Sequence, residues 1–494
     1  MSGELPKGWA TAQISDVTER VPNIKPEDSP DKEFGYVDIS SIDNSSFVIT
    51  DVKRFKGKDA PSRARRPIRP NDIVFSNVRT YLRNVALVDQ HCGAEVCSTG
   101  FTVLRPNAAV EPRFLFRYVL TDQFLDRVTP QQTGTHYPAT SDRVVISEQI
   151  SLAPLPEQRR IVAKLETLLG KVDASQQRLA KIPVLLKRFR QSVLAAACSG
   201  RLTADWREEN PADEIAEDLL SIVLTHRVNV WKRSGRKGSC PVAPMPDTPS
   251  LRDVPLGWAW IPLGILGANP FETVQTGPFG ALLHKEEFTP SGVPVVAVGN
   301  LTGMGFTKEG LYFVPYAKAL QLSRFDIQAG DVLFARSGAT LGKVCVAPPD
   351  AKDWRMTGHI LRARLNRDFL LPNFCVFALR GDPAVMRQVF GSVQGTTRPG
   401  YNTTLLESIA LPLAPLPEQQ EIVRRVEGLF ALADQLELRL AKAHGQVDQL
   451  TPSLLVLAFA GKLVPQDPSD EPASVLLERI NTHHPSKSRR DDRK

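Results

Sequence analysis

The stretch LAPLPEQRRIVAKLETLLGKVD at residues 152–173 returns as LAPLPEQQEIVRRVEGLFALAD at residues 413–434. The two copies are identical at 12 of 22 positions, without a gap, at an offset of 261 residues. In both, a proline precedes Glu-Gln and a run of apolar residues at helical spacing, which predicts the start of a helix. The chain is therefore expected to build the same helix twice.

The repetition extends outward from these helices. Shared residues and segments are, first copy then second, Gly8-Trp9 and Gly257-Trp258, residues 68–88 and 327–347, Gly134 and Gly395, and residues 199–202 and 460–463. A period of about 260 residues is far longer than that of a solenoid repeat. The sequence therefore predicts duplication of a whole domain together with a helical arm.

The first roughly 150 residues of each copy combine short β-type runs, such as DIVFSNV and DVLFAR, with Pro- and Gly-rich turns. Asn71-Asp72 and Gly330-Asp331 are typical of turns that precede strands. The predicted fold class is α/β, with two similar mixed domains separated by two long helices. The predicted boundaries are 1–152 and 253–413 for the domains, 153–200 and 414–464 for the helical arms, 201–252 for a mobile linker and 465–494 for a tail.

Each arm carries apolar residues at strict 4-3 spacing, from Ile161 to Ala196 and from Ile422 to Leu457, with Ser175 as the polar exception. This pattern predicts an antiparallel coiled coil between the two helices. Gly200 and Gly461 are expected to end them, and Pro183 and Pro452 to kink them. An alternative is that each amphipathic helix packs only on its own domain.

Composition places the chain among ordinary globular proteins. It carries a net charge of +7, with basic residues clustered on several segments, which is compatible with a nucleic-acid partner. No apolar run is long enough to span a membrane and the N-terminal residues do not resemble a signal peptide, so we expect a cytoplasmic protein. His91, Cys92 and Cys97 lack a further pair of ligands, and no metal site is predicted.

No familiar catalytic motif is complete. GATLGKV at 338–344 lacks the first glycine and the final Ser/Thr of a P-loop. Asn269-Pro270-Phe271 lacks the second proline of the Asn-Pro-Pro-Tyr motif of amino-methyltransferases. These negatives favour a protein that binds rather than one that catalyses.

Two variable α/β domains, each followed by a helix that opens with PLPEQ and closes with a small residue and Gly-(Arg/Lys)-Leu, resemble the specificity subunit of type I restriction–modification enzymes. Residues 181–207 and 421–434 also look like that family's shared regions, and the resemblance covers essentially the whole chain. It implies a non-catalytic subunit whose two target-recognition domains, held apart by the coiled coil, each read half of a bipartite double-stranded DNA site. It also implies two methyltransferase and two motor–nuclease subunits as partners, which would bind S-adenosylmethionine, ATP and Mg²⁺.

Two aligned pairs of loop segments have the chemistry for DNA contacts, because Arg, Asn and Gln pair with base edges and glycines let the backbone approach phosphates. The candidates from 76–84 and its counterpart are Arg79, Tyr81, Arg83, Asn84, Arg336, Ser337, Thr340 and Lys343. The candidates from 133–141 and its counterpart are Thr133, Thr135, His136, Tyr137, Gln394, Thr396, Thr397, Arg398, Tyr401 and Asn402.

Three other interpretations stay open at this point. One is a stand-alone DNA-binding regulator or anti-restriction decoy built from the same modules. Another is a coiled-coil scaffold with protein-binding ends, which predicts no salt-dependent affinity for DNA. The third is an enzyme with an unfamiliar site.

Overall fold

In the computed structural model the chain forms two compact units. Unit 1 comprises Met1–Ala180 with Leu440–Lys494, and unit 2 comprises Lys181–Arg439. The structure describes residues 5–211, 218–243, 245, 251–278, 282–303, 305–336, 341–391 and 402–483. Within that part of the chain, no helix is both long and apolar enough to cross a membrane.

The first domain, in unit 1, is a mixed α/β domain with two four-stranded sheets, ordered β6-β3-β10-β7 and β2-β11-β8-β9. A two-stranded ribbon, β1 with β12, joins its beginning to its end, and β4 pairs with β5. The strands are β1 (Ala10–Gln13), β2 (Thr18–Glu19), β3 (Glu33–Val37), β4 (Ile42–Asp43), β5 (Val48–Ile49), β6 (Lys53–Lys56), β7 (Ala64–Pro67), β8 (Ile73–Ser76), β9 (Val85–Leu87), β10 (Val96–Ser98), β11 (Phe101–Pro106) and β12 (Gln149–Leu152). The helices are α1 (Pro112–Val119), α2 (Asp122–Val128) and α3 (Asp142–Ser147).

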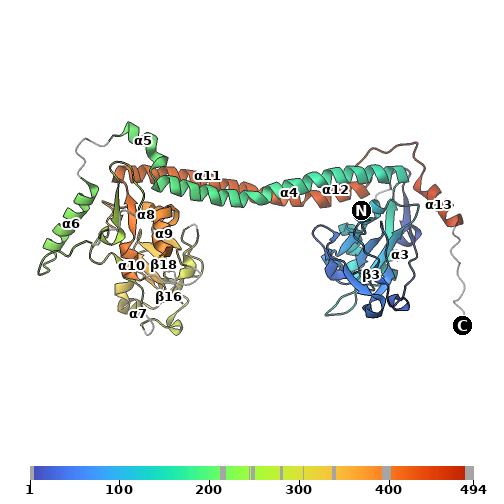
Figure 1. Cartoon of the computed structure of the whole chain (residues 1–494), viewed down its shortest axis with the longest axis horizontal. Helices are drawn as coiled ribbons and strands as arrows, with labels where there is room; N and C mark the ends of the chain where they lie inside the picture. Colours follow the sequence, from blue (N-terminus) through green and yellow to red (C-terminus); the bar gives the residue numbers. More distant parts are fainter. Residues whose placement is uncertain are drawn as a thin grey trace. The chain divides into compact units, whose positions relative to one another are not determined.

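The second domain, in unit 2, repeats this topology. Its sheets run β16-β15-β20-β17 and β14-β21-β18-β19, and β13 pairs with β22 as β1 does with β12. The strands are β13 (Ala259–Pro262), β14 (Val274–Thr276), β15 (Val293–Val296), β16 (Tyr312–Val314), β17 (Asp326–Ile327), β18 (Val332–Ala335), β19 (Val344–Val346), β20 (Trp354–Met356), β21 (Ile360–Ala363) and β22 (Ala410–Leu413). The helices are α7 (Tyr316–Gln321), α8 (Pro372–Gly381), α9 (Pro383–Gly391) and α10 (Thr403–Ser408), and α8 to α10 lie close to β18 in Figure 1.

The turns predicted before β8 and β18 are confirmed, and each is held by the same ion pair. Asn71 and Gly330 have φ of 74° and 84°, the left-handed region that a tight turn uses. Asp72 then pairs with Arg105 at 2.7 Å, and Asp331 pairs with Arg364 at 2.8 Å. Both aspartates are buried, so each arginine compensates a charge that would be costly alone.

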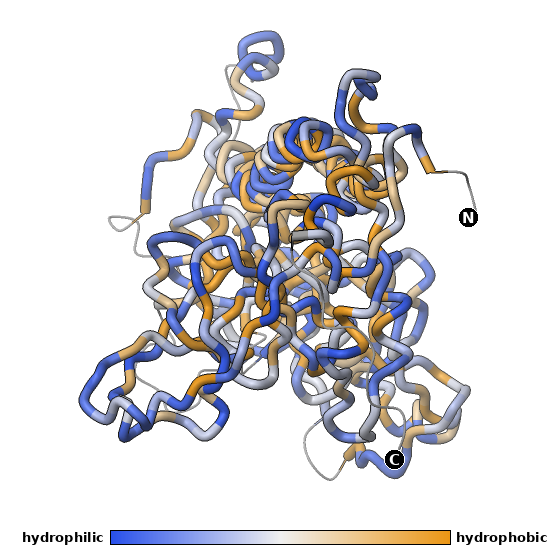
Figure 2. Tube along the Cα trace, turned by 90° about the vertical axis from the view of Figure 1, so that its right-hand side faces the viewer, coloured by the Kyte–Doolittle hydropathy of each residue, from blue (hydrophilic) through white to orange (hydrophobic). Residues whose placement is uncertain are grey.

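The two predicted arm helices are α4 (Leu155–Cys198) and α11 (Leu416–Asp448) followed by α12 (Leu450–Phe459). Within unit 1, Gln176 on α4 bonds to Asp448 on α11 at 3.1 Å. Within unit 2, Arg190 on α4 bonds to Glu437 at 2.6 Å and to Asp434 at 2.5 Å. As the position rises along α4 it falls along α11, so the antiparallel coiled coil is confirmed. Seen nearly end-on in Figure 2, these helices interleave hydrophilic and hydrophobic residues.

The seam departs from strict 4-3 spacing in places. Four residues predicted to be buried in it are instead exposed: Phe189, Leu436, Leu450 and Leu457. Near the end of α12 the buried residues are Leu455, Ala458 and Phe459, because this end packs on the first domain as well as on α4. At the end of α12 the heptad prediction is therefore wrong because a domain core competes for the helix face, and nothing in the structure explains the exposure of Phe189 and Leu436.

The two prolines have different effects. α4 continues through Pro183 without an end. Pro452 has no N–H to donate to the carbonyl of Asp448, so the hydrogen-bond ladder is interrupted at Gln449. Gln449 keeps right-handed helical angles, φ −77° and ψ −14°, so the backbone path stays helical although α11 and α12 are separate elements.

Each helical arm ends against the domain of the other copy. The predicted end glycines are confirmed, with φ of 72° at Gly200 and 66° at Gly461. A Cβ on Gly461 would lie 2.5 Å from Pro6 in the first domain, and a Cβ on Gly200 would lie 2.5 Å from Pro255 before the second. Unit 1 is thus built from the first domain with both the start of α4 and the end of α12.

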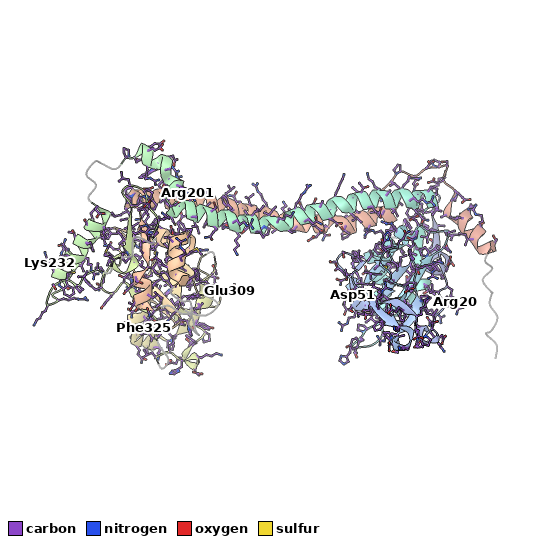
Figure 3. All side chains as sticks on the ribbon, in the orientation of Figure 1. Arg20, Asp51, Arg201, Lys232, Glu309 and Phe325 are labelled. Atoms are coloured by element: carbon purple, nitrogen blue, oxygen red, sulfur yellow. The ribbon has the colours of Figure 1, made fainter. Side chains whose placement is uncertain are left out.

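The segments that follow the arms are also helical. The stretch 201–252, predicted as a mobile linker, contains α5 (Ala204–Glu209) and α6 (Leu219–Arg233), while α13 (Ala473–His483) lies in the tail. Figure 3 marks Arg201 directly after α4 and Lys232 on α6. Val223 of α6 is fully buried in the core of the second domain, so an apolar face that the linker prediction overlooked anchors this helix.

Candidate nucleic-acid interface

In the first domain the structure brings the two predicted segments together. One is the loop 76–84 between β8 and β9, and the other is the loop 132–141 that leads into α3. The N–H of Arg79 donates to the carbonyl of Pro138 at 2.8 Å, and Val78 forms a β-bridge with Ala139. The N–H of Thr140 donates to the carbonyl of Asn77 at 2.8 Å. We call these two segments the loop pair.

A buried polar network fixes the base of the loop pair. The Asn77 side chain donates to Asp142 Oδ1 at 2.9 Å and accepts from Thr102 Oγ1 at 2.7 Å. Arg66 pairs with the other oxygen of Asp142 at 2.5 Å. Asn77 therefore supports the candidate interface, a role that was not predicted from the sequence. The only sequence signal is that Asn77 lies in a polar loop segment, because its hydrogen-bond partners are 25 and 65 positions away.

At the tip of the loop pair the candidate side chains point to solvent. Arg79, Tyr81, Thr133, Thr135, His136 and Tyr137 are all exposed. The Arg79 guanidinium lies over the Tyr137 ring, 5.7 Å from its centroid, and donates to the His136 carbonyl at 3.3 Å. Cationic, aromatic and hydrogen-bonding groups thus share one exposed surface, a chemistry suited to DNA phosphates and base edges.

Two other candidates in the same loop serve the fold. Arg83 pairs with Asp122 and also donates to the carbonyl of Leu120 at 3.3 Å. Asn84 is buried, and its carbonyl accepts from the N–H of Ser76 at 3.0 Å. Both residues support the loop pair from below rather than extending from its tip.

In the second domain the structure describes only some of the predicted DNA-contact residues. Arg336 is half-buried, with its N–H donating to the His359 carbonyl at 2.9 Å, and Lys343 is also half-buried. Asn402 caps α10, since its Oδ1 accepts from the N–H of Leu405 at 2.7 Å. The candidates that lie outside the described residues are Ser337, Thr340, Gln394, Thr396, Thr397, Arg398 and Tyr401.

The PLPEQ and Gly-Trp motifs meet at the base of each domain. Trp9 Nε1 donates to Glu157 Oε2 at 3.1 Å, and Trp258 Nε1 donates to Glu418 Oε2 at 2.7 Å. Both motifs recur together in both copies, but their contact was not predicted from the sequence. Burial raises the pKa of Glu157, and the Trp9 hydrogen bond lowers it in part.

The glutamine of PLPEQ forms three hydrogen bonds to the backbone around it. The Gln158 side chain accepts from the N–H of Glu111 at 2.8 Å and donates to the carbonyls of Ala109 and Ala153. Gln419 makes the equivalent three bonds in the second domain, to Leu371, Phe369 and Ala414. The helix opening that is shared by both copies is therefore the joint between each domain and its arm helix.

Comparison with known proteins identifies the architecture. The family model of the type I restriction modification DNA specificity domain matches residues 6–184 and 280–442, which is most of the chain. The chain belongs to the family of type I restriction–modification specificity subunits. Each of the two matches covers α/β-domain residues together with a stretch of α4 or α11.

Relatives in the specificity-subunit family match over nearly the full length. The EcoKI specificity subunit of Escherichia coli K12 is 27% identical over 97% of this chain and 96% of its own. The StySPI specificity subunit of Salmonella potsdam is 26% identical over the same shares of the two chains. Specificity subunits are the non-catalytic DNA-recognition components of type I systems, so this chain is a recognition subunit and not an enzyme.

Solved structures of the specificity-subunit family share the fold. The HsdS subunit of Thermoanaerobacter tengcongensis is 25% identical, with a TM-score of 0.62 over 93% of this chain and 99% of its own. A chain in a structure that addresses complex assembly of the type I R-M system is also 25% identical, with a TM-score of 0.68 over 93% of this chain and all of its own.

Proposed function

We propose that this subunit reads a bipartite, asymmetric site in double-stranded DNA, one half-site with each α/β domain, and recruits methyltransferase and motor–nuclease subunits to it in the cytoplasm. The observation that carries the proposal is the loop pair, an exposed cationic and aromatic surface on a buried polar base. The repeat then implies a second reading surface on the second domain.

The two half-sites differ because the two loop regions differ on the same framework. Both domains have the same strand order. Yet the loop after β8 reads NVRTYLRN, whereas the loop after β18 reads RSGATLGK. Side chains at loop tips select base edges, so unlike loops on like scaffolds select unlike bases.

The paired helices act as the ruler between the half-sites. An α-helix rises 1.5 Å per residue, so one added heptad lengthens a helix by roughly 10 Å, which corresponds to about three base pairs of duplex. A heptad keeps the seam in phase only if both helices receive one. Matched insertions after Gln176 in α4 and before Asp448 in α11 should therefore widen the unread gap by about three base pairs.

Partner subunits dock on apolar residues of the arm helices that the fold leaves uncovered. In unit 2 these residues are Val184, Leu185, Leu432 and Leu438, and Leu438 is 73% exposed. These four exposed apolar side chains lie on the two arm helices, and a shared patch of such residues would fit a protein partner. The family's organisation implies two methyltransferase subunits, which bind S-adenosylmethionine, and two motor–nuclease subunits, which bind ATP and Mg²⁺.

The test is to co-express the subunit with the methyltransferase subunit of the same system and to map modified adenines in host DNA by single-molecule sequencing. A split motif with two unlike halves and a fixed gap is expected only when this chain is present. Unmodified DNA from a soluble, assembled complex would contradict the proposal.

Binding measurements with the assembled complex provide a second readout. For a protein that neutralises several phosphates, the logarithm of the binding constant falls linearly with the logarithm of the salt concentration. The specific site should still be bound more tightly than random DNA. Leu438→Glu tests recruitment, since it should abolish co-purification of the methyltransferase while the subunit remains folded.

A further inference from the structure

The loop pair contains two arginines in a backbone conformation that favours glycine. Arg79 has φ 49° and ψ 58°, and Arg83 has φ 55° and ψ 39°, on either side of the short turn Thr80–Leu82. A side chain in the left-handed region brings Cβ close to the following carbonyl oxygen, so residues other than glycine, asparagine and aspartate rarely adopt it.

The second copy has glycines at the two aligned positions of its sequence. In the aligned loop, Gly338 stands opposite Arg79 and Gly342 stands opposite Arg83. Gly342 has φ 85°, which confirms that the left-handed conformation belongs to the turn and not to the arginines. The first domain therefore tolerates backbone strain at two positions where the sequence of the second copy has glycine, and each arginine side chain must offset that cost.

Arg83 offsets the cost of its strained backbone through contacts within the fold. Its guanidinium pairs with Asp122 and donates to the carbonyl of Leu120 at 3.3 Å, which ties the loop to the corner between α1 and α2. This arginine has its charge compensated by a carboxylate. It is a positioning residue for the loop.

Arg79 has no comparable structural role in the loop. Its side chain is exposed, and among the described residues no carboxylate forms an ion pair with it. Its contacts are the His136 carbonyl, 3.3 Å from Nη2, and the ring of Tyr137, a side chain that is itself 75% exposed. These contacts hold one edge and one face of the guanidinium, while the remaining N–H donors stay available to a ligand.

We infer that Arg79 is the residue with which the first domain reads a guanine, an inference that rests on the proposed function. A guanidinium fork donates two parallel hydrogen bonds to the O6 and N7 atoms of guanine in the major groove. A fork already held by a carbonyl and an aromatic face loses less freedom when it binds. Phosphate contacts fix the protein's position on the duplex, whereas only contacts with base edges carry sequence information, which a bidentate guanidinium can read.

The test compares the wild-type complex with Arg79→Gly and Arg79→Lys, each co-expressed with the methyltransferase subunit, by mapping methylated adenines. Arg79→Gly relieves the strained backbone, so its melting temperature should equal or exceed that of the wild type. The expected result is that one fixed guanine in one half-site becomes degenerate, with discrimination reduced roughly 5- to 150-fold. The other half-site and the gap should not change.

Arg79→Lys distinguishes a base contact from a phosphate contact, since lysine keeps the charge and loses the fork. It should also relax the guanine. The control Arg54→Ala removes an exposed arginine of β6 from the same domain and should leave every fixed base in place. Retention of all fixed bases in Arg79→Gly, or a loss of affinity that is uniform across sequences, would overturn the inference and leave the proposed function intact. A wild-type complex that directs no split motif would overturn both.

Discussion

The indole nitrogen of Trp9 lies 3.1 Å from a carboxylate oxygen of Glu157, 148 positions further along the chain. Trp258 and Glu418 repeat this pair at 2.7 Å. The two joints differ in the second carboxylate oxygen. Oε1 of Glu418 accepts from Thr203 at 2.6 Å and from Arg207, whereas Oε1 of Glu157 has no partner among the described residues.

This difference predicts unequal effects of removing the indole donor. Trp9→Phe leaves the buried Glu157 carboxylate without a hydrogen bond from the described residues, whereas Trp258→Phe leaves Glu418 with two. We expect Trp9→Phe to destabilise its unit by about 1–3 kcal/mol and Trp258→Phe by less. Hydrogen exchange of the helix amides next to each glutamate measures the two effects separately, and equal protection losses would contradict the prediction.

The arm helices offer a matched pair of neighbouring leucines. Leu186 is 6% exposed and Leu185 is 57% exposed. Leu186→Glu should therefore cost at least about 2 kcal/mol, the usual loss for a buried leucine, and should abolish recognition of a split site. Leu185→Glu should change unfolding by less than about 0.5 kcal/mol.

Circular dichroism melts and DNA binding of the two variants separate the outcomes. If Leu186→Glu still bound the split site with wild-type affinity, the paired helices would not be what holds the two readers in register. Loss of methyltransferase binding by Leu185→Glu, with normal melting, would locate the partner on the exposed face.

Acid sensitivity is expected where α11 meets the turn after α4. Arg424 and Arg425 hold Glu421 and lower its pKa from 4.5 to about 2, and Arg425 also pairs with Asp205 at 2.7 Å. Because the folded pKa lies below the unfolded one, the stabilisation is complete above pH 4.5 and is lost as the pH falls toward 2. Glu421→Gln should thus melt below the wild type at pH 6, and the difference should shrink by pH 3.

The control is Glu208→Gln, which changes an exposed glutamate on the neighbouring α5. Its melting temperature should follow the wild type at every pH. A Glu421→Gln deficit that stays constant between pH 6 and pH 3 would show that the ion pairs do not carry the stabilisation.

The buried network beneath the loop pair makes a prediction about motion. Asn77→Ala removes the side-chain bonds to Asp142 and Thr102 while keeping the backbone path. The amides of Arg79 and Thr140 should then exchange roughly 5- to 150-fold faster, the equivalent of 1–3 kcal/mol for lost buried hydrogen bonds. The control Thr135→Ala, at the exposed tip, should leave both exchange rates unchanged. Unchanged rates in Asn77→Ala would contradict the prediction, because they would show that the two loops hold each other without the Asn77 side chain.

The sequence predicted features that local signals determine. Pro156 opens α4, Gly200 ends the following turn, and the turn at Asn71 precedes β8, because each depends on a few adjacent residues. The repeat supplied the larger architecture, since it showed two domains and two helices of similar length. The segments 76–84 and 133–141 were each expected to be loops, but their contact with one another was not predicted.

Features that depend on distant partners were not predictable in this way. Trp9 and Glu157 were noted separately, but nothing in spacing brings them together. Leu457 was expected in the seam, whereas Phe459 is buried instead, because the first domain competes with α4 for the face of α12. Asn77 was overlooked because its role is visible only with Asp142 and Thr102 in place.

The packing of α12 on the first domain has a consequence for biosynthesis. Phe459 lies between Phe114 and Tyr118, with ring centroids 5.0 and 5.1 Å away, so the first domain completes its core with a residue that is translated long after the domain itself. At 5–20 residues per second, synthesis from the end of β12 to Phe459 takes roughly 15–60 s. Throughout that interval Phe114 and Tyr118 lack the ring that covers them in the finished structure, which leaves time for a chaperone or another protein to bind them before the chain's own helix does.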